Sequence, residues 1–348
     1  MVRMKDVAER AGVSVATVSN VITGKRNVSP KVQKAVLNAI DEMDYHVNMI
    51  ARGLKTQRTN TIGVILPDVT KLFFNDVLKG IMNAASAEGY SISIHSSNYD
   101  FEEEKRLIST LRGMHVDGII LDSCVDYNHL HEWAEEIVHM LPSSIPVVSL
   151  ENVLDEESIS SVIIDCRYWS SQITQHLIDQ GCKKIFYISG PASLVHEHER
   201  LLGYKHALEN NGLQISDDLI TYHDFLSGSA YEVVRQALSS GLEFDAIQAS
   251  NDQAAIGAIK ALKEANIKIP EEVAVIGFDD VFPSSLVTPA VTTIHVPRCD
   301  MGYQSVMECI RKINDETSAP RRIVLKCKTI LRNSSVSSLE TSWDLDNW

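Results

Sequence analysis

Short apolar runs alternate with longer helical stretches through most of this chain of 348 residues. The apolar runs of strand length are Ile62–Leu66, Tyr90–His95, Val116–Leu121, Ile145–Leu150, Val162–Ile164, Lys184–Ser189, Ala246–Ala249 and Val273–Phe278. Helical periodicity marks the stretches Phe74–Glu88, Glu102–Gly113, Ser170–Gln180, Arg200–Asn210, Tyr231–Ser239 and Gln253–Ala265. Strands that alternate with helices form parallel sheets covered by helices on both faces. The pattern therefore predicts an α/β fold for this part of the chain.

Polar loops follow several of the expected strands. They are Pro67-Asp68, Asp122-Ser123, Gly190-Pro191, Ser250-Asn251-Asp252 and Asp279-Asp280. Ligands of open α/β sheets bind beside the carboxyl ends of the strands. We therefore expect these loops to line a ligand site.

Charge is distributed unevenly along the chain. The first 58 residues carry ten lysines and arginines against five acids, and the remainder carries 22 against 41. The whole chain has a formal net charge of −14, which alone argues against nucleic acid as a partner. A small basic segment joined to a large acidic body is nevertheless typical of a DNA-binding domain fused to another domain. A solvated basic surface is the simpler alternative.

Other features bound the class of protein. No apolar run approaches the roughly 18 residues that a membrane helix needs, and the first residues do not form a secretory signal. The six cysteines are scattered, which predicts buried thiols in a reducing compartment and neither a disulfide framework nor a zinc site. We expect a cytoplasmic protein that has no membrane partner, cofactor or metal.

The basic segment has the pattern of a helix-turn-helix. Met4–Ala11 and Val15–Ile22 have apolar stripes at helical spacing, and Gly12 and Ser14 between them suit a turn and a helix cap. Ser29-Pro30 predicts the start of a third helix that runs to Asp44, with Ser29 as its cap. A three-helix bundle without a DNA-binding role is the alternative. It would explain the three helices, but not the combination of turn, helix cap, basic charge and location at the start of the chain.

Side chains of the second helix are suited to DNA. Val15 and Ala16 offer apolar contact to a thymine methyl, and Asn20 is able to pair with adenine. Phosphate contacts are expected from Ser14, Thr17, Ser19, Lys25 and Arg26. The base-contacting residues would recognise the DNA sequence, and the phosphate-contacting residues would fix the position of the helix along the DNA.

The segment after the third helix is short and polar. Asn48 is placed to cap one short helix, but Gly53 weakens it, so it should fold only when held. Leu54 between basic neighbours suits a wedge in a minor groove. A plain linker is the alternative.

At this point the chain resembles the LacI/GalR family of transcriptional repressors. The motifs that carry the resemblance are Asp6-Val7-Ala8, Ala11-Gly12-Val13-Ser14, Thr17-Val18-Ser19, Val21-Ile22 and Ala51-Arg52-Gly53-Leu54-Lys55. The resemblance implies a homodimer on a pseudo-palindromic double-stranded DNA operator. It also implies paired hinge helices in the minor groove, with DNA contacts from Ala51, Leu54 and Lys55. Family members often have Arg at the position of Asn20, so the half-site sequence does not transfer.

The resemblance also implies the domain organisation. Residues 1–46 form the helix-turn-helix domain, 47–59 the hinge helix and linker, and 341–348 a tail. Residues 60–340 form an effector-binding and dimerisation domain like periplasmic sugar-binding proteins. Its first lobe spans about 60–161 and 293–322, and its second about 162–292 and 323–340.

A small-molecule effector is expected between the lobes. Arg200 offers a fork of donors and Asp279 two acceptors, and both match effector-holding positions of the family. Asn251 matches a sugar-contacting position, and Phe73 and Phe225 match aromatic positions that wall in the ligand. Asp165 is a further candidate. A helix cap or an ion pair is the alternative for each.

His196-Glu197-His198 departs from the family pattern just before Arg200. Residues two apart do not share a helix face, so we do not interpret the segment as a metal site. We expect two solvent-facing imidazoles or polar contacts to the ligand.

The sequence leaves several alternatives open. A sugar or sugar derivative is favoured as effector over a nucleobase. The competing function is a DNA-binding regulator that a protein partner signals through the outer face of the first lobe. An enzyme is disfavoured because no phosphate loop, nucleophile elbow or H-E-x-x-H motif is present. A tetramer would need an additional association helix.

Overall fold

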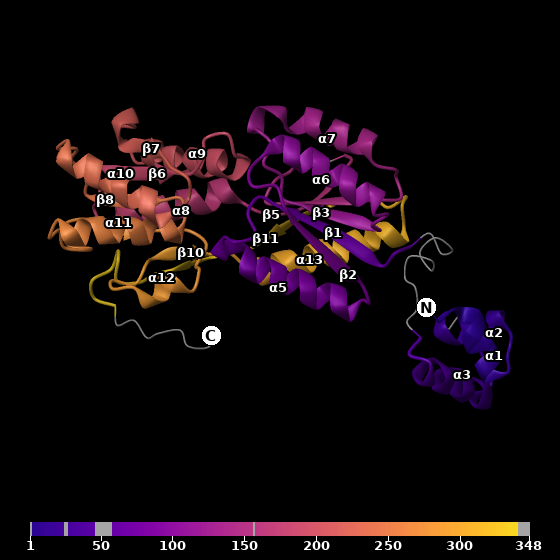
Figure 1. Ribbon diagram of the computed structural model, residues 1–348. Helices are drawn as coiled ribbons and strands as arrows, with labels where there is room; N and C mark the ends of the chain where they lie inside the picture. The colour runs from indigo at the N-terminus through magenta and orange to yellow at the C-terminus, as the bar shows by residue number, and fades with distance from the viewer. Residues whose placement is uncertain (1, 24–26, 46–57, 156, 340–348) are drawn as a thin grey trace. The chain divides into compact units, whose positions relative to one another are not determined.

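The computed structural model describes residues 2–23, 27–45, 58–155 and 157–339. They belong to two compact units, Met1–Thr59 and Asn60–Trp348 (Figure 1). Within the described residues, no helix is long and apolar enough to cross a membrane.

The first unit contains three helices, α1 (Met4–Ala11), α2 (Val15–Thr23) and α3 (Pro30–Glu42). They pack around a small apolar core of Val7, Ala8, Val18, Val36 and Ala39. The predicted helix-turn-helix is thus confirmed as a structure.

Two local signals shape the turn between α1 and α2. Gly12 has a φ of +65°, a left-handed conformation that glycine adopts without strain. The Thr17 amide donates to Ser14 Oγ at 3.1 Å, so Ser14 caps α2 as predicted. The expected cap of α3 is wrong in one respect, because the Ser29 side chain makes no cap hydrogen bond. Pro30 at the first helical position begins α3 instead.

The second unit contains two parallel sheets. The first has the order β11-β5-β4-β3-β1-β2. Its strands are β1 (Thr61–Leu66), β2 (Ser91–Ser96), β3 (Gly118–Leu121), β4 (Val147–Leu150), β5 (Ser160–Ile164) and β11 (Arg322–Leu325). Neighbouring strands are parallel throughout, and Ile62 of β1 lies between Ile92 and Gly118.

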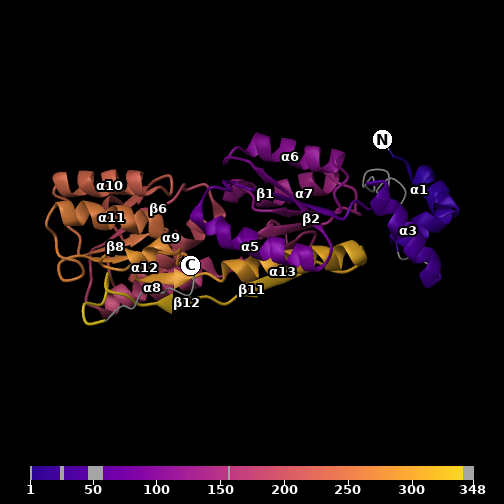
Figure 2. The same cartoon turned by 60° about the horizontal axis from the view of Figure 1, so that its bottom comes forward.

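Two pairs of helices cover the first sheet. Helices α5 (Leu72–Ala87) and α13 (Arg298–Asn314) pack on one face, and α6 (Phe101–Gly113) and α7 (Leu130–Met140) on the other (Figure 2). A Cβ at Gly302 would lie 2.0 Å from the Val77 carbonyl oxygen. The backbones of α5 and α13 therefore touch, which only glycine permits there.

The second sheet has the order β7-β6-β8-β9 and is also parallel. Its strands are β6 (Ile185–Ser189), β7 (Ile220–Tyr222), β8 (Ala246–Ala249) and β9 (Ala274–Ile276). Helices α8 (Cys166–Asp179) and α9 (Val195–Asn210) cover one face, and α10 (Ser227–Ser239) and α11 (Asp252–Glu264) the other. The α/β expectation for this half is confirmed.

Short elements complete the second unit. They are η1 (Tyr127–His129), η2 (Asp217–Leu219), α12 (Pro283–Leu286), β10 (Thr293–His295) and β12 (Lys328–Ile330). Strands β10 and β12 pair with each other in antiparallel fashion.

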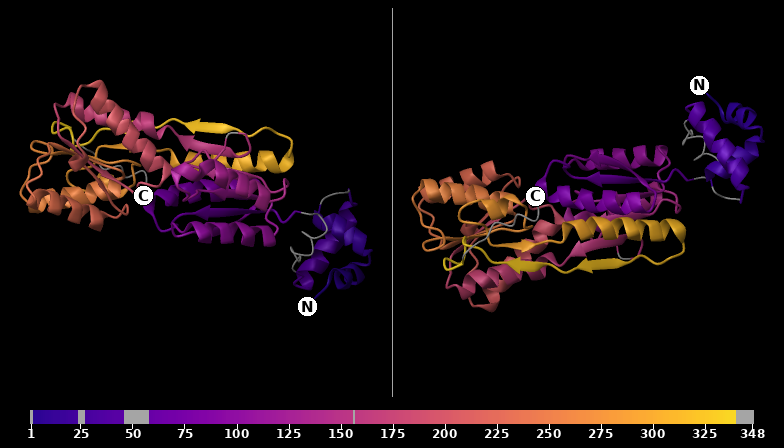
Figure 3. Two further views of the ribbon diagram at one scale, coloured as in Figure 1. Left: turned by 90° about the horizontal axis from the view of Figure 1, so that it is seen from above. Right: turned by 90° about the horizontal axis from the view of Figure 1, so that it is seen from below.

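The chain crosses between the lobes three times, but two crossings lie later than expected. Strand β5 stays in the first sheet through Ile164, and β11 stays there through Leu325. The expected lobe ends at residues 161 and 322 therefore fall too early, because pairing between these two strands holds both in the first sheet. After β11 the chain returns to the second lobe, where the Val275 amide donates to the Ser334 carbonyl (Figure 3).

Candidate functional site

A cavity lies between the two lobes at the carboxyl ends of their strands. It measures about 620 Å³, including its opening to solvent. The first lobe contributes Pro67, Lys71, Phe73, Phe74, Tyr99, Asp122, Ser123 and Glu151. The second contributes Leu194, His196, Arg200, Phe225, Asn251, Asp252, Gln253, Asp279 and Val281. The cavity is where the polar loops predicted a ligand site.

Arg200 of α9 is the most strongly held polar group of the cavity. Its Nη1 donates to the Ser250 carbonyl at 2.7 Å and to Glu197 Oε1 at 3.2 Å. Its Nη2 lies 3.4 Å from Asp279 Oδ1, and its guanidinium stacks on Phe278 at 4.0 Å. Burial opposes the charge, yet the two carboxylates outweigh it and keep the pKa of Arg200 above its usual value. The Nε is buried and has no hydrogen-bond partner among the described residues.

Asp279 faces Arg200 from the loop after β9. Its φ is +103°, a strained conformation for a residue with a side chain. Its amide donates to the Ile294 carbonyl at 2.9 Å, and its own carbonyl accepts from Arg298. Burial raises the pKa of Asp279 to about 6, although Arg200 and Arg298 oppose the rise. The backbone is thus held so that the carboxyl reaches the cavity.

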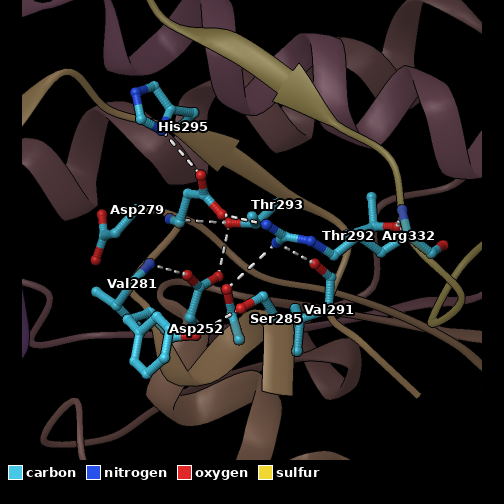
Figure 4. A network of polar contacts seen from close by, with 12 residues as sticks. Asp252, Asp279, Val281, Ser285, Val291, Thr292, Thr293, His295 and Arg332 are labelled. Atoms are coloured by element: carbon cyan, nitrogen blue, oxygen red, sulfur yellow. Dashed lines mark hydrogen bonds and ion pairs between the residues drawn. The ribbon is translucent and has the colours of Figure 1, made fainter. Parts of the chain in front are cut away.

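A hydrogen-bonded network supports the same loop from below (Figure 4). Asp252 accepts from the Thr293 hydroxyl at 2.6 Å and from the Val281 amide at 2.8 Å. Asp280 accepts from Arg332 Nη2 at 2.8 Å. Because these contacts join segments far apart in the sequence, they fix the loop relative to β10 and the final segment.

Two carboxyl groups of the first lobe face the cavity as a pair. Asp122 follows β3 and Glu151 follows β4, so parallel neighbours place them at the same sheet edge. Burial and then the charges of Glu151 and Glu104 raise the pKa of Asp122 well above its usual range. Burial likewise raises the pKa of Glu151 to about 7.

Phe225 forms an aromatic wall with an unusual backbone. It has a φ of +68° and its ring packs against Gly190, where a Cβ would lie 2.1 Å from Phe225 Cε1. The Phe225 amide donates to His223 Nδ1 at 3.1 Å. Burial lowers the pKa of His223 to about 4, so the imidazole stays neutral and able to accept.

Asn251 lines the cavity but is already bonded. Its Oδ1 accepts from the Ala254 amide at 2.8 Å, which caps α11, and its Nδ2 donates to the Phe225 carbonyl at 3.2 Å. The helix-cap alternative for Asn251 is therefore present, at a position that also lines the cavity. Phe73 lines the cavity and packs edge-on against Phe74 at 5.2 Å.

Asp165 lies elsewhere. It is exposed, it is not among the residues that line the cavity, and it accepts from the Tyr168 amide at 2.9 Å as the cap of α8. The structure therefore agrees with the alternative that we gave for Asp165, a helix cap.

The segment before Arg200 lies at the cavity and at the contact between the lobes. Helix α9 begins at Val195, so His196 and Glu197 lie in its first turn. His196 lines the cavity instead of facing solvent, and burial lowers its pKa to about 3. His198 stacks on Tyr127 of the first lobe at 4.0 Å. Within the described residues, no group of three or more His, Cys, Asp and Glu is placed to hold a metal ion.

The lobes touch around the cavity, so the cleft is closed. Lys71 Nζ donates to the Asp224 carbonyl at 3.4 Å, and the Tyr127 amide donates to the Ser193 carbonyl at 3.0 Å. Tyr99 stacks on Phe225 at 6.2 Å. Tyr99, Lys71 and Glu151 are functional candidates that sequence reasoning missed. In the sequence, the one indication of a role for these residues was their position after or near the end of an expected strand.

Helix α2 presents an accessible face in the first unit. Val15 is 43% exposed and Ala16 is exposed, whereas Val18 is buried. Ser14 Oγ and Thr17 Oγ1 lie 2.9 Å apart near the helix start. Ser19 and Asn20 are partly exposed. Lys25, Arg26, Ala51, Leu54 and Lys55, the other expected DNA contacts, lie outside the described residues.

Two family models match the chain and together cover most of it. Residues 3–48 match bacterial regulatory proteins of the lacI family. Residues 59–333 match periplasmic binding proteins and the sugar binding domain of the LacI family. The chain belongs to the LacI family of bacterial regulatory proteins. It is accordingly a DNA-binding transcriptional regulator with an effector domain of the periplasmic-binding-protein type.

Individual members of the LacI family are similar to this chain in sequence and fold. Catabolite control protein A of Priestia megaterium is 34% identical over 91% of this chain and 94% of its own length. A structure of the transcriptional regulator CelR in complex with cellobiose matches with a TM-score of 0.72 and 31% identity, covering 96% of this chain and 100% of that one. The lac repressor dimer bound to operator and an anti-inducer matches with a TM-score of 0.86 and 25% identity, covering 96% and 99%.

Proposed function

We propose that this chain is a repressor whose operator affinity is controlled by a small polar molecule, a sugar or sugar derivative, enclosed between the lobes. The observation that carries this is the cavity between the lobes, with Arg200 and Asp279 at its wall. A buried guanidinium with its N–H donors and a carboxyl group with acceptors match the donors and acceptors of hydroxyl groups. The cavity serves binding and regulation, not catalysis.

Control follows from the way the cavity is built. Each lobe supplies part of its wall, so a ligand binds the closed arrangement more tightly than an open one. The first lobe is joined to the helix-turn-helix unit by the segment at residues 47–59. A shift between lobe arrangements thereby changes how two copies present that unit to a pseudo-palindromic operator.

On DNA, Val15, Ala16 and Asn20 read base edges in the major groove. Ser14, Thr17, Ser19, Lys25 and Arg26 hold phosphates. The exposure of Val15 and Ala16 supports the assignment, because a residue that reads bases must be accessible. Ala51, Leu54 and Lys55 act in the minor groove.

A thermal-shift screen of the full-length chain with sugars, sugar derivatives and nucleobases identifies the ligand class. A ligand at a hundredfold excess over its dissociation constant stabilises the native state by about 2.7 kcal/mol. A hit should shift operator affinity in a titration with double-stranded DNA. A folded chain with no hit in a broad library would contradict the proposal and favour a protein signal.

The role of Arg200 is tested with Arg200→Lys, which keeps the charge but loses the planar fork. We expect the hit to bind at least about tenfold more weakly to this variant, on the scale of one lost charge-assisted hydrogen bond. Arg235→Lys is the matched control, since Arg235 is 56% exposed and pairs with nearby Glu232. Equal binding by wild type and Arg200→Lys would move the ligand elsewhere.

A further inference from the structure

The cavity holds more carboxyl groups than cations. Asp122, Glu151 and Asp279 line it, and Glu197 lies directly behind Arg200. The ion pairs of Arg200 go to Glu197 and Asp279. Among the described residues, neither Asp122 nor Glu151 forms an ion pair with a lysine or arginine. The wall supplied by the first lobe therefore holds two carboxyl groups and one lysine, Lys71, which pairs with neither of them. Arg200 acts on Glu151 from the opposite lobe.

Asp122 is the clearest sign of a missing partner. It is 1% exposed, and its Oδ2 has no hydrogen-bond partner among the described residues. Behind it lies Glu104, which is fully buried but accepts from the Ser123 hydroxyl at 2.6 Å and from Trp133 Nε1 at 2.9 Å. Glu104 is thus hydrogen-bonded by protein groups. Asp122 lines the cavity, where its polar neighbour is a second carboxyl group, that of Glu151.

The negative potential is felt by each acid of this wall. Burial raises the pKa of Tyr99, and the charges of Asp122 and Glu151 raise it further. Burial raises the pKa values of Asp122 and Glu151 as well, and the charge of Glu151 adds to the rise for Asp122. A bound cation would allow these carboxyl groups to ionise, whereas an anion would meet repulsion.

Aromatic rings complete the surroundings. Tyr99 stacks on Phe225 at 6.2 Å, and His196 lies 6.0 Å from the same ring. Aromatic faces suit both the apolar face of a sugar ring and a nearby ammonium group. His196 adds no competing positive charge because burial lowers its pKa to about 3.

We propose that the effector carries a protonated primary amino group on a polyhydroxylated body, as an amino sugar does. The ammonium lies against Asp122 and Glu151, where its three N–H donors serve both carboxyl groups. The hydroxyl groups face Arg200 and Asp279. This inference rests on the proposed function and names the ligand class of the same site.

Matched sugars test the amino group directly. Thermal shift and calorimetry on the full-length chain would compare D-glucosamine with D-glucose, N-acetyl-D-glucosamine and D-glucose 6-phosphate. The galacto- and manno-configured sets are measured alongside, because the ring configuration is a separate variable. We expect an amino sugar of at least one set to bind at least tenfold more tightly than its neutral, acetylated and phosphorylated counterparts. Tighter binding of a neutral or phosphorylated sugar would overturn the proposal, as would the absence of binding by every amino sugar.

Asp122→Asn tests the position of the amino group. The variant keeps the size of the side chain and removes only its ability to ionise, so the ligand-free protein should be at least as stable as the wild type at neutral pH. We expect it to bind the amino sugar at least tenfold more weakly, and to lower the ratio of amino-sugar to neutral-sugar affinity at least tenfold. Asp218→Asn, at an exposed position in η2, is the matched control. Unchanged amino-sugar affinity in Asp122→Asn would overturn the proposal.

The two proposals fail in different ways. Suppose that a neutral sugar binds the wild type more tightly than any amino sugar does, and that it binds Arg200→Lys more weakly. The proposed function is then supported, and the proposal of an amino group on the effector is rejected. If an amino sugar binds but Arg200→Lys leaves its affinity unchanged, the cleft assignment itself is wrong.

Discussion

At the residue scale, the cavity depends on a buried guanidinium between two carboxylates. Arg200 is 4% exposed, and both Glu197 and Asp279 face it. A buried ion pair is a weak source of net stability, but removing one partner leaves uncompensated charge in a poorly hydrated site. Arg200 therefore has a structural role beside its proposed ligand contact.

Arg200→Ala is expected to lower the free energy of unfolding of the effector unit by about 3–5 kcal/mol at neutral pH. Denaturant titration followed by circular dichroism measures the change. Arg235→Ala, which removes an exposed arginine, should stay within about 0.5 kcal/mol of wild type. A loss below about 1 kcal/mol in Arg200→Ala would show that Glu197 and Asp279 are neutral without their partner.

The raised pKa of Glu151 makes the stability of the effector unit depend on pH, and the direction of the pKa shift determines the sign of this dependence. Its pKa is raised from the ordinary 4.5 to about 7, so the native state binds more protons than the unfolded state between these values. Ionising Glu151 therefore costs stability as pH rises through this window, and the cost is complete above about pH 7. Glu151→Gln should be more stable than wild type by about 1–3 kcal/mol at pH 8 and similar to it near pH 5.

Melting temperatures of ligand-free wild type and Glu151→Gln from pH 5 to 8 check this. Glu88→Gln, at an exposed position after α5, is the control and should show no such trend. A difference between Glu151→Gln and wild type that does not change with pH would contradict the account.

At the element scale, regular apolar periodicity made most elements predictable. Strand β8 has the predicted bounds Ala246–Ala249, and α1 has the predicted bounds Met4–Ala11. Helix α9 was predicted too short because its first turn buries Glu197 and holds His196 at the cavity, and such polar residues interrupt the apolar pattern. Helix α13 was missed for a similar reason, since it buries Glu308.

The site was predictable only in part. Arg200, Asp279 and Phe225 were found through the family resemblance, and the structure brings them together at one cavity. Glu151 and Tyr99 were missed because their loops approach the cavity through strand order, which one sequence does not reveal. The backbone at Asp279 and Phe225, with φ values of +103° and +68°, is imposed by tertiary contacts and has no sequence signal.

The cap of α2 offers a test at this scale. Ser14→Ala removes the acceptor of the Thr17 amide and should destabilise the helix-turn-helix unit by about 0.5–2 kcal/mol. Ser29→Ala is the matched control, because Ser29 makes no side-chain cap bond and its removal should cost less. Hydrogen exchange of α2 amides in the full-length chain measures both. Equal protection in the two variants would contradict the assignment of Ser14 as the cap.

At the scale of the whole molecule, the chain joins a basic unit for DNA to an acidic unit that encloses a cavity. The cavity lies between the two lobes, and the first lobe is joined in sequence to the helix-turn-helix unit through residues 47–59. The lobes touch around the cavity, as in the Tyr127–His198 stack. We therefore expect lobe closure itself to set operator affinity.

A disulfide across the cleft tests this claim most directly. Asp126 and Leu194, one from each lobe, form an antiparallel bridge, whose Cα separation of about 4.5–5.5 Å suits a disulfide. The Asp126→Cys/Leu194→Cys variant would be titrated with operator DNA in oxidised and reduced forms without ligand, and each single variant would serve as a control. We predict at least about a tenfold difference in operator affinity between the two forms, the scale of an ordinary allosteric coupling. Equal affinity of the locked and unlocked forms would contradict the account.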